Sequence, residues 1–330
     1  MYLDLNARLR FMIKEKVQAV REYLSSQILG QLDLIDGLML ALLSDGHILV
    51  EGPPGIAKTR AIKELSKCIE GSFHRIQFTP DLLPADVTGT DVYRPQDGTF
   101  AFQPGPLFHH LLLTDEINRA PAKVQSALLE AMGEKQITIG RKTYPLPDLF
   151  LVMATQNPLE HEGTYPLPEA QLDRFMLHIK IDYPNANDEL NILRLNHYEM
   201  QHHEQPKQHP LLTQKELFEA RDAVLDVSIS EELEKYIVNI VNATRNPVSY
   251  NGDLARWLAC GVSPRATMAL CRCARARAWL SDRDYVTPDD IQVCTYPVMR
   301  HRLILSMEGE ADGITTDDVI EKILSLVVVS

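Results

Sequence analysis

The sequence has few cysteines and no long apolar run. Five cysteines in 330 residues are too few and too irregularly spaced for a disulfide framework or for two paired CxxC motifs. Cys271 and Cys273 fall in an alanine-rich helical segment, so we expect small buried side chains there and not metal ligands. No stretch approaches the ~18 apolar residues of a membrane span, and the N-terminus is unlike a signal peptide. These absences predict a cytoplasmic protein without a membrane span.

Positive charge is also in deficit. Lysine and arginine total 33 against 45 acidic residues, a net charge of −12, which weighs against nucleic acid or anionic membrane as a partner. Residues 256–302 are an exception, with eight arginines, no lysine and four aspartates. Arginine suits phosphate or carboxylate clamps better than diffuse attraction. We therefore expect the arginines of this segment to serve a bound nucleotide or subunit contacts.

Five short apolar runs alternate with helical segments in the first half of the chain. Strands that are apolar throughout and alternate with helices are typical of a parallel sheet covered on both faces. Two more helices are expected before the first strand. The predicted strands are 47–51, 73–78, 111–114, 149–155 and 175–181, and the predicted helices are 5–29, 32–43, 59–69 and 121–133.

The composition changes after residue 181. Residues 182–187 resemble a linker, and helix-start signals follow at Thr213, Ser230 and Thr287. The sequence therefore predicts an α/β domain over residues 1–183 and an all-α domain over residues 184–330. Residues 201–210 contain three histidines without regular spacing, which favours a loop over a metal site.

Two β-hairpins interrupt the α/β alternation. Residues 92–102 contain a Gln-Asp-Gly turn between two β-rich pieces, and residues 137–144 turn around Gly140. An inserted hairpin that the core does not need can contact a partner or substrate. A decorative loop is an equally good interpretation from sequence alone.

The clearest motif is GPPGIAKT at residues 52–59, which follows a predicted strand and precedes a predicted helix. This is the setting of a phosphate-binding loop, in which backbone N–H groups surround the phosphates, Lys58 contacts the β and γ phosphates and Thr59 offers a hydroxyl to Mg²⁺. Ala57 departs from the strict pattern, which has glycine before the lysine. The residues expected to bind the nucleotide here are Gly52, Pro53, Pro54, Gly55, Ile56, Ala57, Lys58, Thr59 and Arg60.

Acidic and polar residues follow the next strands. Asp115 and Glu116 end a buried strand at the edge where α/β sheets bind ligands. Asp115 fits a magnesium-holding acid, and Glu116 fits the base that polarises the attacking water. Asn157 ends the following strand and could hold that water or contact the γ-phosphate. Taken alone, each would be an ordinary turn residue.

Two arginines lie outside these strand ends. Arg174 precedes the fifth strand and, taken alone, would be a surface arginine paired with Asp173. Arg265 follows Ser263 and Pro264, which are typical of a cap and a first helical position. A cation is disfavoured at the positive end of a helix, so Arg265 is expected to face an anion. A screened, exposed arginine is the alternative.

These motifs together resemble the Walker A, Walker B, sensor 1, arginine-finger and sensor 2 elements of an AAA+ ATPase, and more closely those of the MoxR family. The matching segments are GPPGIAKT (52–59), TDEINRAP (114–121), QSALLEAM (125–132), ATQNP (154–158), EGTYPLPEAQLDRF (162–175), SPR (263–265) and VMRHRL (298–303).

The resemblance implies further properties. It implies an AAA+ core with inserted hairpins and a helical lid, ATP and Mg²⁺ as ligands, and a ring-shaped homo-oligomer, usually a hexamer. Arg174 would act on the ATP of the neighbouring subunit, whereas Arg265 could act in cis or in trans. Ile28, Leu29 and Gly30 would lie near the adenine.

The function that the resemblance implies is ATP-driven remodelling or maturation of other proteins. Partners would be von Willebrand factor A domain proteins, and metal cofactors can be inserted in the process. Three alternatives remain: a magnesium-chelatase ATPase subunit, a nucleic-acid-dependent motor and a nucleotide-gated scaffold. Intact Glu116 and Arg174 weigh against the scaffold.

Overall fold

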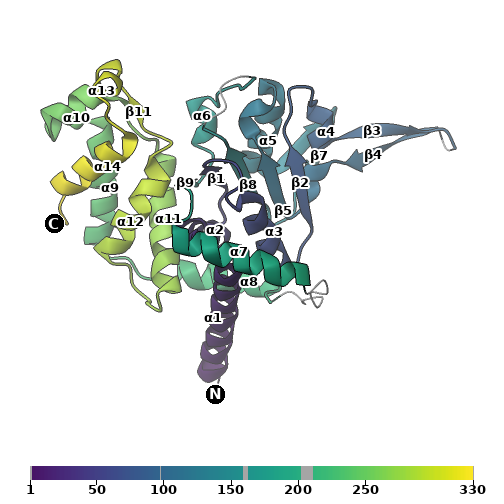
Figure 1. Ribbon diagram of the computed structural model, residues 1–330, viewed down its shortest axis with the longest axis horizontal. Coiled ribbons are helices and arrows are strands. Elements are labelled where there is room, and N and C mark those ends of the chain that lie inside the picture. Colours follow the sequence, from purple (N-terminus) through teal and green to yellow (C-terminus); the bar gives the residue numbers. More distant parts are fainter. Residues whose placement is uncertain (1, 97, 159–162, 202–210, 330) are drawn as a thin grey trace.

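A parallel five-stranded sheet forms the centre of the molecule. The computed structural model describes residues 2–96, 98–158, 163–201 and 211–329. The strands lie in the order β2-β5-β8-β1-β9, and all neighbours are parallel (Figure 1). This confirms the predicted sheet. Its strands are β1 (Ile48–Glu51), β2 (Phe73–Gln77), β5 (Leu111–Asp115), β8 (Leu151–Gln156) and β9 (Leu177–Lys180).

Helices cover both faces of this sheet because its central strands are apolar throughout. Successive side chains of a strand point to opposite faces, so Leu111 and Leu113 pack into one hydrophobic cluster and Leu112 into another. The first cluster includes α1 (Tyr2–Gln27), α2 (Leu32–Leu43) and α3 (Lys58–Cys68). The second includes α4 (Pro84–Thr88) and α5 (Ala122–Glu134).

Both predicted hairpins are present. The first consists of β3 (Gly89–Arg94) and β4 (Thr99–Pro104) and projects far from the body (Figure 1). The second consists of β6 (Gln136–Ile139) and β7 (Lys142–Pro145). The rings of Phe102 and Tyr144 stack with centroids 4.1 Å apart, so the hairpins contact each other at their bases.

The rest of the chain is mainly helical, as predicted, but it also contains a short antiparallel pair of strands, β10 (Leu258–Cys260) and β11 (Ile304–Leu305), that the all-α prediction did not include. Thr213, Ser230 and Ser263 each accept a hydrogen bond from a backbone N–H at a helix start. The α-helices are α6 (Glu169–Leu172), α7 (Ala186–Gln201), α8 (Gln214–Leu225), α9 (Glu231–Arg245), α10 (Gly252–Trp257), α11 (Pro264–Leu280), α12 (Pro288–Met299), α13 (Met307–Ala311) and α14 (Thr316–Leu326).

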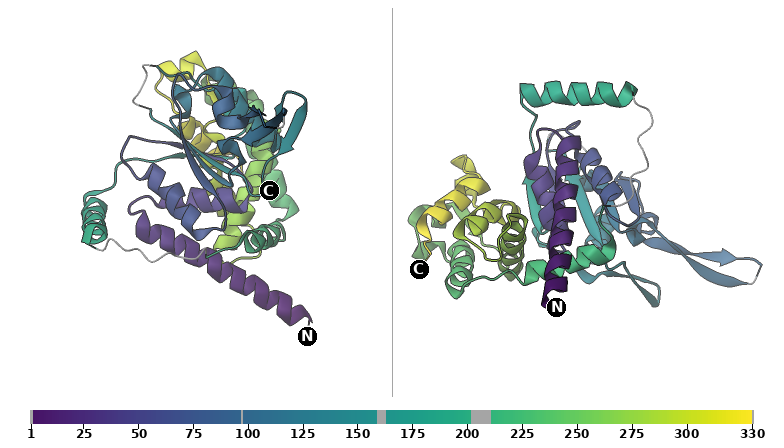
Figure 2. Two further views of the ribbon diagram at one scale, coloured as in Figure 1. Left: turned by 90° about the vertical axis from the view of Figure 1, so that its right-hand side faces the viewer. Right: turned by 90° about the horizontal axis from the view of Figure 1, so that it is seen from below.

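The helical region is not separated from the sheet by a polar gap. One hydrophobic cluster contains residues of β1, β8 and β9 together with residues of α8, α9, α11, α12 and α14. Helix α7 differs, because none of its residues is buried and it stands off from the body (Figure 2). It begins at Ala186, slightly before the predicted linker ends.

The two cysteines of α11 differ in burial. Cys273 is buried, as expected, whereas Cys271 is only partly buried. The part of the chain that the structure describes contains no group of three or more metal-binding side chains, and none of its helices is long and apolar enough to cross a membrane. Residues 202–210 of the histidine-containing segment lie outside the described residues.

His47 is buried as a neutral imidazole at the start of β1. Its Nδ1 accepts a hydrogen bond of 3.1 Å from the N–H of Val152, so Nε2 carries the proton and donates to the carbonyl of Met132 at 3.3 Å. Burial lowers the pKa of His47 from its ordinary value of 6.5 to about 4. Between these two pH values the imidazole is neutral in the folded state and protonated in the unfolded chain.

The free energy of unfolding should consequently fall as the pH drops from 6.5 towards 4. A difference of this size in pKa corresponds to a loss of about 3 kcal/mol. His47→Gln, which can keep a donor and an acceptor, should flatten this part of the profile. Urea denaturation of both proteins between pH 7 and 4 measures the effect. Identical pH slopes would show that His47 titrates normally.

Candidate active site

The loop of residues 52–57 connects β1 to the start of α3 and leaves room for phosphates. Gly55 has φ +85°, and a Cβ built on it would meet nothing within 4 Å. Backbone N–H groups at the N-terminus of α3 face this loop, which favours an anion. Gly52 is closely packed instead, since a Cβ there would lie 2.6 Å from the carbonyl oxygen of Ile181.

Ala57 has a left-handed backbone with φ +61° immediately before α3. A glycine adopts this conformation without cost, whereas another residue pays roughly 1–2 kcal/mol. The loop therefore keeps the turn of the strict motif although the residue differs. This geometry explains why Ala57 is compatible with phosphate binding.

Lys58 and Thr59 form the first turn of α3. The ammonium of Lys58 donates a hydrogen bond of 2.6 Å to the carbonyl of Gly52, so it lies folded over the loop. The hydroxyl of Thr59 is 3.4 Å from Oδ2 of Asp115. A hydroxyl and a carboxylate on adjacent elements are oxygen donors of the kind that Mg²⁺ prefers, so these two residues fit the ion.

Asp115 is held by two residues that sequence analysis missed. The hydroxyl of Thr155, on β8, donates a hydrogen bond of 2.7 Å to its Oδ1. Arg75, on β2, donates from Nε to its Oδ2 at 2.9 Å. The available signal was a polar residue within a predicted strand: Thr155 ends the apolar run 149–155, and Arg75 lies in the half-polar segment 73–78. Their roles emerge only from the strand order β2-β5-β8.

Glu116 has a constrained backbone and a directed side chain. Its φ of +56° is left-handed, a conformation that costs energy and is often found at functional sites. Gln77 donates from Nε2 to its Oε2 at 2.8 Å, and Nε of Arg119 lies 3.2 Å from the same oxygen. Its backbone N–H donates to the hydroxyl of Thr155 at 3.1 Å. The carboxylate is thereby fixed at the carboxyl end of β5.

Asn157 lies at the same edge of the sheet. It is 6% exposed and directly follows β8, whose last residue, Gln156, accepts a hydrogen bond of 3.3 Å from the N–H of Gly52. The structure therefore brings together the loop, Asp115, Glu116 and Asn157, as the sequence predicts.

A small pocket of about 110 Å³ adjoins the loop. Leu29, Gly55 and Ala57 line it on one side and Ile192 of α7 on the other. Ile28 does not line this pocket, because it is buried in the hydrophobic core. Gly30 does not line it either, so of this segment Leu29 alone faces the pocket, and the position of the segment near the adenine stays a prediction.

Arg60 also lines this pocket, but its guanidinium is engaged. It is bonded to the carboxylate of Glu199 on α7 and to Gln27 at 3.1 Å. The pair with Glu199 attaches α7 to α3. Arg60 therefore positions the wall of the pocket.

Arg174 and Arg265 lie together, away from the loop. Both line a pocket of about 280 Å³. Arg174 donates to the carbonyl of Leu129 at 2.5 Å, and Arg265 lies 3.5 Å from the carboxylate of Asp173. The structure thus places the two predicted arginines in one pocket, which none of the phosphate-binding residues lines.

The separation follows from the sheet. Arg174 precedes β9, which runs parallel to β1 with Ile48 opposite Leu177, so it lies beyond the amino end of these strands. The phosphate-binding loop follows their carboxyl end. Strands of four residues rise ~3.3 Å per residue, which places the two about 13 Å or more apart. Arg174 cannot contact phosphates bound to its own loop.

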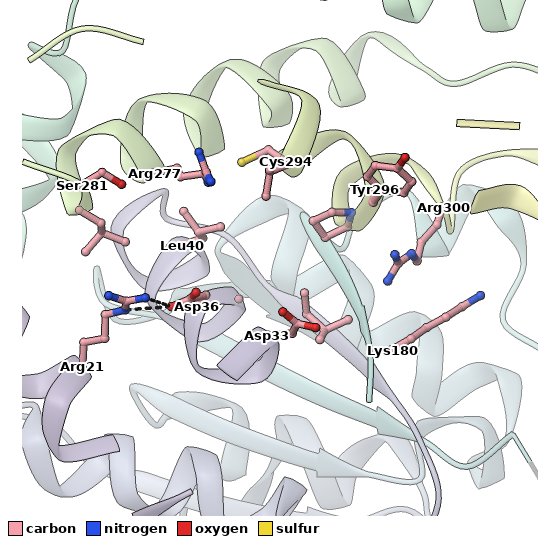
Figure 3. Close-up of a pocket in the computed structure, with 15 residues that line it drawn as sticks. Arg21, Asp33, Asp36, Leu40, Lys180, Arg277, Ser281, Cys294, Tyr296 and Arg300 are labelled. Atoms are coloured by element: carbon pink, nitrogen blue, oxygen red, sulfur yellow. Dashed lines mark hydrogen bonds and ion pairs between the residues drawn. The ribbon is translucent and has the colours of Figure 1, made fainter. Parts of the chain in front are cut away.

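Another pocket, of about 340 Å³, lies where α1, α2 and β9 meet α11 and α12 (Figure 3). Arg21 and Asp36 form an ion pair of 2.7 Å on one wall, and Tyr296 and Arg300 lie on the other (Figure 3). It contains none of the predicted site residues. The pocket therefore lies at the interface between the α/β region and the helices that follow.

Comparison with known proteins agrees with this architecture. A model of the ATPase family associated with various cellular activities (AAA) matches residues 47–177, and a model of the AAA lid domain matches residues 255–323. A crystal structure of a protein from Cytophaga hutchinsonii, provisionally named an ATPase, is 44% identical with a TM-score of 0.92, and the alignment covers 100% of this chain and 99% of that one.

Relatives are similar over most of the chain. It is 44% identical to Chaperone MoxR1 of Mycobacterium tuberculosis, over 91% of this chain and 78% of that protein. It is 42% identical to the uncharacterized protein YeaC of Bacillus subtilis, over 93% of this chain and 92% of that protein. The magnesium-chelatase subunit ChlI of Nicotiana tabacum is more distant, at 29% identity over 63% of this chain.

Proposed function

This chain belongs to the MoxR family of AAA ATPases, and we propose that its ATP hydrolysis requires Mg²⁺, occurs between the subunits of a ring and drives the remodelling of partner proteins. The observation that carries the proposal is the distance between the phosphate-binding loop and Arg174. One chain supplies both halves of a site at opposite ends of its sheet, so a complete site needs a second copy.

The half-site at the carboxyl edge binds ATP and activates water. Lys58 and the loop N–H groups bind the phosphates, and Thr59 with Asp115 would hold Mg²⁺, which neutralises phosphate charge. Glu116 accepts the proton of the attacking water, with Gln77 keeping its carboxylate in place. Asn157 orients that water.

The other half-site stabilises the transition state. Arg174 of one subunit places its guanidinium against the γ-phosphate bound by the next subunit, as an arginine finger does. Arg265 lies in the same pocket as Arg174, and this proximity favours action in trans for both. We propose residues 1–183 as the nucleotide-binding core and residues 184–330 as the lid that moves with the nucleotide state.

We further propose a hexameric ring with a chaperone-like role. The name of the relative Chaperone MoxR1 supports this role, and the projecting β3–β4 hairpin, with Tyr93 and Phe100 exposed, suits contact with a client. Partners with a von Willebrand factor A domain, and metal-cofactor insertion into them, come from the family resemblance. Five free cysteines support a cytoplasmic setting.

Turnover per subunit should rise with protein concentration and depend on Mg²⁺. Dilution separates the two half-sites, so specific ATPase activity should fall steeply where sedimentation shows monomers. Chelation of Mg²⁺ should abolish activity at any concentration. Specific activity that is unchanged in the monomer would contradict a site shared between subunits.

A further inference from the structure

The pocket that holds Arg174 and Arg265 carries an excess of positive charge. Five cations and two carboxylates line it; we call it the arginine pocket. The imidazole of His47, which also lines it, is neutral because burial lowers its pKa to about 4. The charged residues are Lys135, Arg174, Arg265, Arg272, Arg302, Asp45 and Asp173.

Other groups already occupy both carboxylates of the arginine pocket. Asp45 accepts from Lys135 at 2.6 Å and from Arg221 at 2.8 Å, one on each oxygen. Asp173 accepts from the buried Arg302 at 2.8 Å and from the hydroxyl of Ser263 at 2.8 and 3.0 Å. Arg265 also lies 3.5 Å from Asp173. Among the described residues, neither carboxylate forms an ion pair with Arg174 or Arg272.

Arg272 differs from most arginines of the helical region. Five of the eight between residues 256 and 302 form ion pairs with carboxylates of this chain at 3.0 Å or less, namely Arg256, Arg277, Arg283, Arg300 and Arg302. These five arginines are thus engaged within the chain, and for the others of the segment a role at a nucleotide or subunit contact stays a prediction. Among the described residues, Arg272 is exposed and has neither a hydrogen bond nor an ion pair.

Arg272 lies on the same face of α11 as Arg265. Arg265, Met268, Ala269 and Arg272 all line the arginine pocket, and this spacing defines one face of a helix. Seven residues separate the two arginines by about 10 Å along the axis. Long guanidinium side chains at that spacing can contact successive phosphates of one triphosphate.

We propose that Arg272 is a third arginine that binds the phosphate chain of ATP held by the neighbouring subunit, together with Arg174 and Arg265. Arginine suits this ligand because its planar fork of N–H donors matches phosphate oxygens and is always charged. The inference rests on the proposed function, because it requires the arginine pocket to meet a second copy's phosphate-binding loop.

Arg272→Ala should lower kcat/KM for ATP by about 10- to 100-fold, the range for losing hydrogen bonds to a charged group. Arg272→Lys should retain part of this because it keeps the charge. Arg256→Ala is the matched control: it removes an exposed arginine of the same region that pairs with Glu308 and Asp312, and it should leave kcat/KM unchanged. An equally active Arg272→Ala would overturn the proposal.

A mixing experiment separates this proposal from the proposed function. Lys58→Ala subunits cannot bind ATP in their own loop but present an intact arginine pocket. Adding them to Arg272→Ala subunits should therefore restore turnover where an intact loop meets an intact pocket. Arg174→Ala is mixed with Lys58→Ala in parallel. If only the Arg174→Ala mixture recovers, Arg272 does not act in trans; if neither recovers, the shared site itself fails. Loss of assembly in Arg272→Ala by sedimentation would assign Arg272 to a subunit contact and refute the phosphate assignment.

Discussion

Replacing Arg174 by alanine is expected to leave ATP binding intact and to lower turnover by about 10³- to 10⁵-fold, the range found for arginine fingers. The reason is geometric: Arg174 lies beyond the amino end of β9, whereas the loop that binds ATP follows the carboxyl end of β1. The affinity of the same subunit's loop for ATP should therefore not change when Arg174 is removed. Binding of a fluorescent ATP analogue and steady-state phosphate release measure the two effects separately.

Arg174→Ala also removes a hydrogen bond of 2.5 Å to the carbonyl of Leu129. Unfolding and sedimentation measurements should therefore accompany the kinetics. The unfolding midpoint should stay close to that of the unchanged protein, because the side chain is only partly buried. Normal turnover in a folded, assembled Arg174→Ala protein would contradict the finger assignment. Loss of ATP binding would place Arg174 in the binding site of its own subunit.

Glu116→Gln is expected to bind ATP and to lose turnover by about 10²- to 10⁴-fold, the usual contribution of a general base. Glutamine keeps an acceptor for Gln77, whose Nε2 is 2.8 Å from the Glu116 carboxylate, so the local fold should persist. It cannot take a proton from water. Single-turnover hydrolysis and ATP retention after gel filtration measure both expectations.

Glu130→Gln is the matched control for Glu116→Gln. Glu130 lies exposed on α5, and its neutralisation should leave turnover unchanged. Because Glu116→Gln should hold ATP, it is also the form with which to capture clients from a lysate. Turnover near the normal rate in Glu116→Gln would assign the proton transfer to another group.

Much of the fold could be predicted from sequence because the signals are local. The apolar runs that become β5 and β8, the turn at Gly140 and the cap at Thr213 each depend on a few adjacent residues. Residues 52–59 likewise carry their function in one contiguous motif. These features can be recognised without knowledge of any long-range contact.

The remaining features depend on strand order and on contacts between distant residues. Arg75 and Thr155 lie forty residues on either side of Asp115 and reach it only because β2 and β8 flank β5. Arg60 meets Glu199 across 139 residues. No spacing rule predicts such pairs. For the same reason, the sequence did not show which arginines of the helical region are already paired.

Mixing two inactive variants tests the shared site most directly. Lys58→Ala cannot bind ATP but presents an intact Arg174, whereas Arg174→Ala binds ATP but lacks the finger. In an equimolar ring assembled at random, about one interface in four pairs an intact loop with an intact arginine. We predict that turnover recovers to about a quarter of the normal rate. A mixture that stays as inactive as its components would show that ATP is not hydrolysed between subunits.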